Sequence, residues 1–138
     1  MLPDPSPFPA VTAAIIARHG KVLVTRRPPW ASAPLHWEFP GGKAEPGETL
    51  EAALARELLE ELDLPGTVGP LFMKVSAREE GCRIDLYAFV VHAAGEPRLR
   101  EHIEARWVEP AELSRLLMTC ADRAVASALA ARGGLFPA

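Results

Sequence analysis

The 138-residue chain is poor in cysteine, and it has no long apolar run and no block of basic residues. Cys82 and Cys120 stand without a partner cluster, so we expect small side chains in a reduced, cytoplasmic protein rather than a nucleophile or a metal site. No stretch reaches about 18 apolar residues, which argues against a membrane-spanning helix. The net charge is −3 and no basic block is present, so a nucleic-acid polymer is not an expected partner. The lack of a long apolar run gives no reason to expect a membrane as a partner.

The amino-terminal segment MLPDPSPFPA lacks the charged and apolar regions of a signal peptide. Its prolines predict an extended, flexible lead-in over residues 1–10. Apolar residues make up 49% of the chain, and its length suits one core. We therefore expect a single domain over residues 11–138.

Hydrophobic patterning predicts strands on both sides of a central helix. Strands are predicted over residues 11–18, 21–27, 67–78 and 81–94 and, briefly, from residue 104; helices are predicted over residues 48–62 and 122–134. Pro110 is typical of a further helix start, and Gly133-Gly134 of a helix end. This order predicts an α/β or α+β sandwich around a mixed β-sheet.

The central helix has two distinct faces, because each residue turns it by about 100°. The first is apolar and is predicted to pack on the sheet: Ala55, Leu58, Leu59 and Leu62. The second carries Glu57, Glu60 and Glu61. Like charges at this spacing repel, and the helix dipole disfavours negative charge in the carboxyl-terminal half. A solvated acidic face is one explanation. A hard divalent cation, Mg²⁺ or Mn²⁺, would offset these costs.

The loop before the helix is consistent with a cation or phosphate site. Gly41 and Gly42 allow the backbone to approach a ligand closely, because no side chain intervenes. Thr49 is suited to cap the helix start. Glu48 complements the positive helix end, and this structural role and a catalytic one both remain open.

The spacing of these residues resembles the Nudix box. Five residues separate Gly42 from Glu48, and seven more precede the run Arg56-Glu57-Leu58-Leu59-Glu60-Glu61. WEFPGGK before the box is similar to the MutT-like branch, and the resemblance implies an α/β/α sandwich. Asp63 stands where the family has glycine. We expect it in a left-handed conformation at a cost of about 1 kcal/mol.

The resemblance implies that Glu57, Glu60 and Glu61 bind Mg²⁺ or Mn²⁺ together with the Gly41 carbonyl. Arg56 would orient these carboxylates rather than touch substrate. The implied chemistry is hydrolysis of a nucleoside diphosphate linked to another group. Glu101 is preferred as general base, with Glu104 and Glu61 as the alternatives.

Residues for substrate contact follow from the same resemblance and from side-chain chemistry. Arg27 is preferred over Arg26 for phosphate binding, and Lys43 is a second candidate. Phe39, Trp37 and Trp30 are candidates for stacking on a base, with core packing as the alternative for the first two. Asp122 is either a base contact or the N-cap of the last helix.

Three functions are considered. The leading prediction is a divalent-metal-dependent pyrophosphohydrolase of nucleoside triphosphates, including oxidised or non-canonical ones, that yields a nucleoside monophosphate and pyrophosphate. The second is the same chemistry on ADP-ribose or dinucleoside polyphosphates. The third is a non-catalytic nucleotide-binding regulator. The intact set of box glutamates favours an enzyme, and the oligomeric state is left open.

Overall fold

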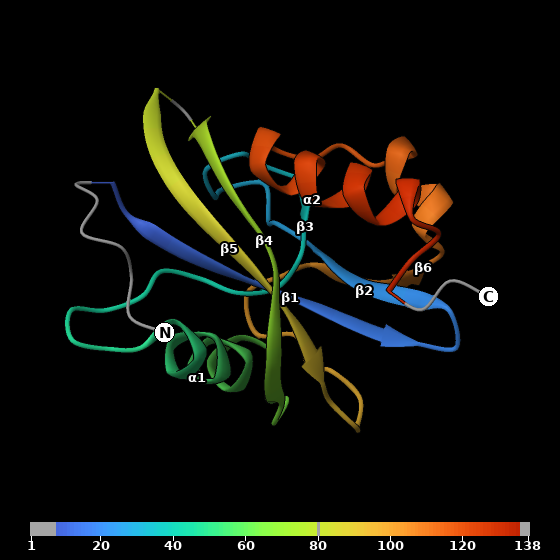
Figure 1. The fold of residues 1–138 in the computed structure, drawn as a ribbon, viewed down its shortest axis with the longest axis horizontal. Helices are drawn as coiled ribbons and strands as arrows, with labels where there is room; N and C mark the ends of the chain where they lie inside the picture. Colours follow the sequence, from blue (N-terminus) through green and yellow to red (C-terminus); the bar gives the residue numbers. More distant parts are fainter. Residues whose placement is uncertain (1–7, 80, 136–138) are drawn as a thin grey trace.

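The computed structural model describes residues 8–79 and 81–135, which form a mixed six-stranded sheet with helices on both faces (Figure 1). The strands are β1 (Ala10–Arg18), β2 (Lys21–Arg26), β3 (Trp37–Glu38), β4 (Thr67–Glu79), β5 (Cys82–His92) and β6 (Glu104–Val108). The helices are α1 (Leu50–Leu62), the 3-10 helix η1 (Pro110–Arg115) and α2 (Cys120–Ala131). The predicted sandwich around a mixed sheet is confirmed. The lead-in predicted for residues 1–10 falls mostly outside the described residues. No helix in the described ranges is long and apolar enough to cross a membrane.

The sheet has the strand order β3-β2-β1-β5-β4, with β6 also paired to β2. Among the described strands, β1 and β5 form the one parallel pair, and the two predicted hairpins, β1–β2 and β4–β5, are both antiparallel. β1 and β2 share two residue pairs beside their turn and then separate. Along the rest of this edge, residues 40–44 take the place of β2: Ala14 N donates to Pro40 O and Thr12 N to Gly42 O, each at 2.8 Å. The two predicted site glycines are therefore held against β1.

The sheet separates two apolar clusters, because α1 and α2 cover opposite faces (Figure 1). α1 buries Leu50, Ala53, Leu54, Leu58 and Leu62 completely. The predicted stripe is thus wrong at Leu59, which is 48% exposed, and only partly right at Ala55, which is half-buried. The buried leucines recur every four residues from Leu50, and Leu59 lies about 100° around the helix from Leu58.

The ends of α1 follow local chemistry. Thr49 is the N-cap and its hydroxyl accepts from Ala52 N at 3.1 Å, so the helix begins at Leu50 rather than near residue 48. Asp63 has φ 50° in the left-handed region, and its N–H is donated to Leu59 O at 3.1 Å. The conformation expected for this residue is confirmed.

The carboxyl-terminal elements differ from the sequence prediction in one important way. α2 begins at Cys120 after Thr119 in the N-cap position, so Asp122 lies in the first turn and its predicted N-cap role is wrong. Pro110 opens only the short helix η1. Gly134 N donates to Leu129 O at 2.8 Å, which closes α2 as predicted. The two-residue strand β3 was missed, because it is too short for a periodic pattern.

Candidate active site

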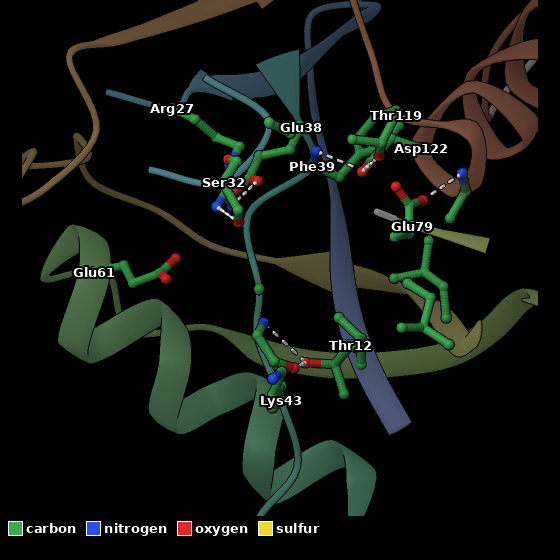
Figure 2. Close-up of a pocket in the computed structure, with 17 residues that line it drawn as sticks. Thr12, Arg27, Ser32, Glu38, Phe39, Lys43, Glu61, Glu79, Thr119 and Asp122 are labelled. Atoms are coloured by element: carbon green, nitrogen blue, oxygen red, sulfur yellow. Dashed lines mark hydrogen bonds and ion pairs between the residues drawn. The ribbon is translucent and has the colours of Figure 1, made fainter. Parts of the chain in front are cut away.

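A cavity of about 310 Å³ lies between α1, the segment before it and the start of α2 (Figure 2). Gly41, Gly42, Lys43, Arg27, Glu38 and Glu61 line one part of it, and Phe39, Glu79, Ile84, Leu86, Thr119 and Asp122 line another. A second cavity of about 240 Å³ shares Arg27, Glu38 and Glu61 with the first and adds Trp30, Glu101 and His102. Several predicted site residues therefore line these two neighbouring cavities: Arg27, Phe39, Gly41, Lys43, Glu61, Glu101 and Asp122. Arg56, Glu57 and Glu60 line neither of them.

Arg56 is the central cation of the acidic helix face. It donates to both oxygens of Glu48 at 2.8 and 2.9 Å, to Glu57 at 3.0 Å and to Glu60 at 3.2 Å. A further bond runs to the Lys43 carbonyl at 3.1 Å. The bond from Arg56 is the largest influence on Glu48 and lowers the pKa of that carboxyl to about 2. In turn, the Glu48 carboxylate raises the pKa of Arg56. Arg56 thus fixes the orientation of several glutamates at once.

Glu61 differs from the other glutamates of α1. Its Oε2 is buried and has no hydrogen-bond partner among the described residues. Burial, the largest influence, raises the pKa of Glu61 to about 8 against the opposing effect of His102, and Glu38 and Glu57 raise it further. Its carboxylate points into the space between α1 and the opposite wall (Figure 2). A buried carboxylate oxygen without a partner is costly unless a cation or a proton satisfies it.

The segment before α1 approaches the acidic face closely. A Cβ on Gly42 would lie 2.4 Å from Glu57 Cδ, and one on Gly41 would lie 2.0 Å from Thr12 O. Since Pro40 O and Gly42 O both face β1, the Gly41 carbonyl between them faces away from that strand. Only glycine therefore permits this path, and a backbone oxygen is turned away from β1.

The donor types present fit a hard divalent cation. Carboxylates from Glu57, Glu60 and Glu61 and one backbone carbonyl are ligands that such cations prefer. Among residues 8–79 and 81–135, no three acidic, histidine or cysteine side chains converge closely enough to hold a metal ion. Arg56 holds oxygens of Glu57 and Glu60, so these side chains must turn from it or share their oxygens when a cation binds.

A chain of polar contacts that sequence reasoning missed lies beside Glu61. Arg27 Nη1 donates to Glu38 Oε1 at 2.9 Å, and Glu38 Oε2 lies 3.0 Å from His102 Nε2. His102 is buried, and its Nδ1 has no partner among the described residues. Burial acts to lower the pKa of His102, but the bond to Glu38 and the charge of Glu61 raise it overall. The signal for Glu38 was its place in WEFPGGK; nothing in the sequence indicated His102.

The candidates for general base differ in whether they line a cavity. Glu101 is exposed and lines the second cavity together with Glu61. Glu104 lies in β6, where it pairs with Arg106 at 2.8 Å and with Arg26 at 3.9 Å. It lines neither cavity. The geometry therefore retains Glu101 and Glu61 as candidates and disfavours Glu104.

The predicted phosphate-binding side chains also differ in whether they line a cavity. Arg27 lines both cavities, and Lys43 lines the larger one and is exposed. Arg26 points elsewhere: its guanidinium lies 5.7 Å from the centre of the Trp37 ring. Trp37 is 5% exposed and belongs to the core, which favours the packing alternative for it.

The other end of the larger cavity holds Phe39 and Asp122. Phe39 is buried, and its N–H is donated to Asp122 Oδ1 at 3.1 Å. The Thr119 hydroxyl donates to Asp122 Oδ2 at 3.0 Å. Burial is the largest influence on this carboxyl and raises the pKa of Asp122 to about 7, and the charge of Glu38 adds to the effect. Asp122 is thus a cavity residue tied to the backbone of the WEFPGGK segment.

Two other residues border the cavities, Trp30 and Glu79. Trp30 is 79% exposed and borders the second cavity. Glu79, at the end of β4, lines the larger cavity, and sequence reasoning gave it no role. Both cysteines are exposed and free, and neither lines the cavities.

Comparison with known proteins agrees with this geometry. The NUDIX domain family profile matches residues 6–129. A CTP pyrophosphohydrolase of Escherichia coli is 39% identical over 113 residues, covering 81% of this chain and 84% of the relative. An 8-oxo-dGTP diphosphatase of Haemophilus influenzae is 36% identical over 101 residues, covering 72% and 74%.

Similarity extends to solved structures. The crystal structure of a MutT protein from Methanosarcina mazei superposes with a TM-score of 0.81, covering 91% of this chain and 95% of that one. At 24% identity this likeness shows the fold. With the profile match, the two relatives and the arrangement of Glu57, Glu60, Glu61 and Arg56, it leads to one conclusion: the chain belongs to the Nudix family, as a MutT-like hydrolase of phosphoric anhydride bonds.

Proposed function

We propose that this protein hydrolyses nucleoside triphosphates, with Mg²⁺ or Mn²⁺ as cofactor, to a nucleoside monophosphate and pyrophosphate. The observation that carries the proposal is the division of one cavity into two chemically different ends. One end has glutamates, glycine backbone and the cations Arg27 and Lys43, which suits phosphates and their cation. The other has Phe39, Ile84 and Leu86 beside Asp122, which suits a nucleobase.

The names of the two relatives support nucleoside triphosphates as the substrate class. One is a CTP pyrophosphohydrolase and the other an 8-oxo-dGTP diphosphatase, so both names specify a nucleoside triphosphate. A cavity of about 310 Å³ lies at the small end of the range for small-molecule sites. This volume is enough for part or all of a mononucleotide, and the names of the relatives are what favour a nucleoside triphosphate over ADP-ribose or a dinucleoside polyphosphate.

The roles of the acidic residues follow from their contacts. Glu57, Glu60, Glu61 and the Gly41 carbonyl would hold the cation, and Arg56 keeps the first two carboxylates in place. When bound, the cation neutralises charge on the phosphate oxygens and increases the acidity of water. Arg27 binds a phosphate oxygen. Glu38 and the Ser32 hydroxyl accept hydrogen bonds from its guanidinium, and His102 contacts Glu38 from the other side.

Glu101 is the proposed general base. It borders the second cavity, which meets the first at Glu61. Glu61 is less suited to this role, because its carboxylate is one of those that would hold the cation. The proton of the attacking water would therefore pass to the Glu101 carboxylate.

The test is product release from a nucleotide panel with Mg²⁺ or Mn²⁺, run beside Glu60→Gln. The panel holds canonical and oxidised triphosphates, ADP-ribose and a dinucleoside tetraphosphate. We expect triphosphates to yield monophosphate and pyrophosphate, and Glu60→Gln to lower kcat at least about 100-fold, or roughly 2.7 kcal/mol in barrier height. Reaction in ¹⁸O-labelled water then shows which phosphorus is attacked.

The matched control is Glu112→Gln, an exposed glutamate of η1 outside both cavities. It should retain wild-type kcat. Preferred turnover of ADP-ribose or the dinucleoside tetraphosphate would replace the proposed substrate. Nucleotide binding without any turnover would overturn the enzyme and favour a regulator.

Three further proposals accompany this function. Residues 11–138 form one domain, the location is cytoplasmic, and the nucleotide is the only partner required. They are supported by the two clusters on a shared sheet, by the low cysteine content and by the absence of a basic block. Limited proteolysis tests the first of them: cleavage should be confined to the ends of the chain.

A further inference from the structure

The base end of the larger cavity contains a second carboxylate, that of Glu79. Glu79 is the last residue of β4, and Asp122 lies in α2. Both side chains line the same end of the cavity (Figure 2). The cations that line this cavity, among the described residues, are Arg27 and Lys43, and Figure 2 shows both away from Glu79. Two carboxylates without a nearby cation repel phosphate, so this end is suited to the uncharged part of a nucleotide.

One oxygen of Glu79 is already used in the fold. Glu79 Oε1 accepts from Ala121 N in the first turn of α2 at 3.0 Å. The N-cap residue Thr119 makes no side-chain cap bond and instead donates its hydroxyl to Asp122. Glu79 therefore caps α2 from a neighbouring strand, and this contact fixes the direction of its carboxylate.

The other oxygen of Glu79 remains available to a ligand. Within residues 8–79 and 81–135, Glu79 Oε2 has no hydrogen-bond partner, and the Glu79 side chain lines the cavity. A carboxylate oxygen only accepts hydrogen bonds when ionised. Its partner on a nucleobase must therefore be an N–H group.

Nucleobases differ at the position where such a partner would sit. Cytosine carries an amino donor at the place where uracil carries a carbonyl acceptor. Guanine carries an exocyclic amino group that hypoxanthine lacks. A carboxylate facing a carbonyl oxygen leaves two acceptors opposed, and a site built for a donor strongly rejects an analogue without it.

We propose that Glu79 is a specificity-determining residue, whose second carboxylate oxygen accepts a hydrogen bond from an exocyclic amino group of the base. The cavity accordingly prefers bases that carry such a group over those with a carbonyl or a hydrogen in its place. This inference rests on the nucleotide-hydrolysing function proposed above.

The decisive variant is Glu79→Gln. Its side-chain carbonyl can still accept from Ala121 N, so the cap on α2 is retained, while an NH₂ group replaces the oxygen that faces the cavity. We expect the ratio of kcat/KM for CTP over UTP to fall at least about tenfold from its wild-type value, and the ratio for dGTP over dITP to fall as well. Glu112→Gln, outside the cavity, should leave both ratios unchanged.

A purely structural role for Glu79 predicts a different result. If Glu79 only caps α2, Glu79→Gln will change kcat/KM for all four nucleotides by one common factor or leave it unaltered, and the proposal fails. Wild-type enzyme that hydrolyses nucleotides without preferring CTP over UTP or dGTP over dITP also overturns it. Wild-type enzyme that hydrolyses no nucleotide overturns the proposed function instead.

A measurement on the wild-type protein covers the case in which Glu79→Gln fails to fold. Titration with CMP and with UMP, neither of which has an anhydride bond to cleave, is followed through the backbone amide signal of Ala121. Because Glu79 joins this amide to the cavity, CMP should shift the Ala121 signal more than UMP does at equal saturation. Equal shifts from the two nucleotides would contradict the proposal.

Discussion

The acidic face of α1, which lies beside one end of the larger cavity, and the α2 end of that cavity both carry carboxylates, but these carboxylates have different partners. On α1, the guanidinium of Arg56 donates to Glu48, Glu57 and Glu60. At the α2 end, backbone N–H groups of Phe39 and Ala121 donate to Asp122 and Glu79. A charged partner can be exchanged for a cation, whereas a backbone amide fixes a carboxylate as part of the fold. The first arrangement suits metal binding, and the second suits recognition by hydrogen bonds.

Arg56→Ala should cause a large loss of stability at the acidic face of α1. Removing the guanidinium leaves several carboxylates without their shared partner, and we expect a loss of about 2 kcal/mol in the free energy of unfolding. This lies below the loss at fully buried pairs, because the Arg56 side chain is 24% exposed. Urea unfolding measures it. Mg²⁺ should restore part of the loss, since a bound cation stabilises the folded state.

Arg115→Ala is the matched control, because it removes one positive charge without removing the contacts that Arg56 makes. Arg115 is exposed in the last turn of η1, so its removal should change stability by less than about 0.5 kcal/mol. Equal losses for the two variants would mean that the contacts of Arg56 contribute nothing, and the contrast between the two ends would be lost.

A change in stability of comparable size, which depends on pH, is expected for Asp122→Asn. In the folded protein the pKa of Asp122 is raised to about 7 from 3.8, mainly by burial, so the folded state holds its proton more tightly than the unfolded state. Stability from this group therefore falls as pH rises from about 4 to about 7, then levels off. Asparagine lacks this titration. The variant should gain about 1 to 3 kcal/mol relative to wild type between pH 4.5 and pH 8.

Urea unfolding at three pH values tests the Asp122 prediction, and a difference that stays constant with pH would refute it. For Glu48, which precedes α1, the contribution to stability should depend on pH in the opposite direction. Glu48 has its pKa lowered to about 2 by the Arg56 bond, so its contribution is present at neutral pH and is lost as pH falls. The difference between wild type and Glu48→Gln should accordingly shrink in acid.

The smallest effect is expected at Asp63, which ends α1 next to the acidic face. Its φ of 50° costs an aspartate more than a glycine, so Asp63→Gly should raise the free energy of unfolding by about 0.5 to 1 kcal/mol. Asp63→Ala is the control and should lower it, because alanine disfavours this conformation. Thermal unfolding of both variants decides the question, and a glycine variant less stable than wild type would exclude strain at this position.

Prediction from sequence succeeded where the chemistry is local. Thr49 and Asp63 were assigned to the ends of α1 from neighbouring residues alone, and both assignments are confirmed. Leu59 was assigned to the wrong face, because the stripe was drawn from the carboxyl-terminal half of the helix and missed the buried series that starts at Leu50. The N-cap assignment of Asp122 was wrong, since Thr119 precedes it in that position.

The candidate site was predictable in the same uneven way. Glu57, Glu60 and Glu61 share one helix, so their spacing alone placed them on one stretch of α1. Glu38, His102 and Glu79 were missed, because their partners lie far along the chain: Glu38 and His102 are 64 residues apart, and Glu79 and Ala121 are 42 apart. No local pattern encodes such pairs.

The sequence by itself therefore determined an acidic helix with defined ends, a glycine pair before it and the order of strands around it. Those features depend on interactions between residues a few positions apart. Only the tertiary structure decided that the Glu61 carboxylate is left without a partner, that Asp122 faces the cavity and that Glu79 caps α2 beside it. These outcomes depend on burial and on contacts between distant segments, which exist only once β1, β4 and the two helices are packed together.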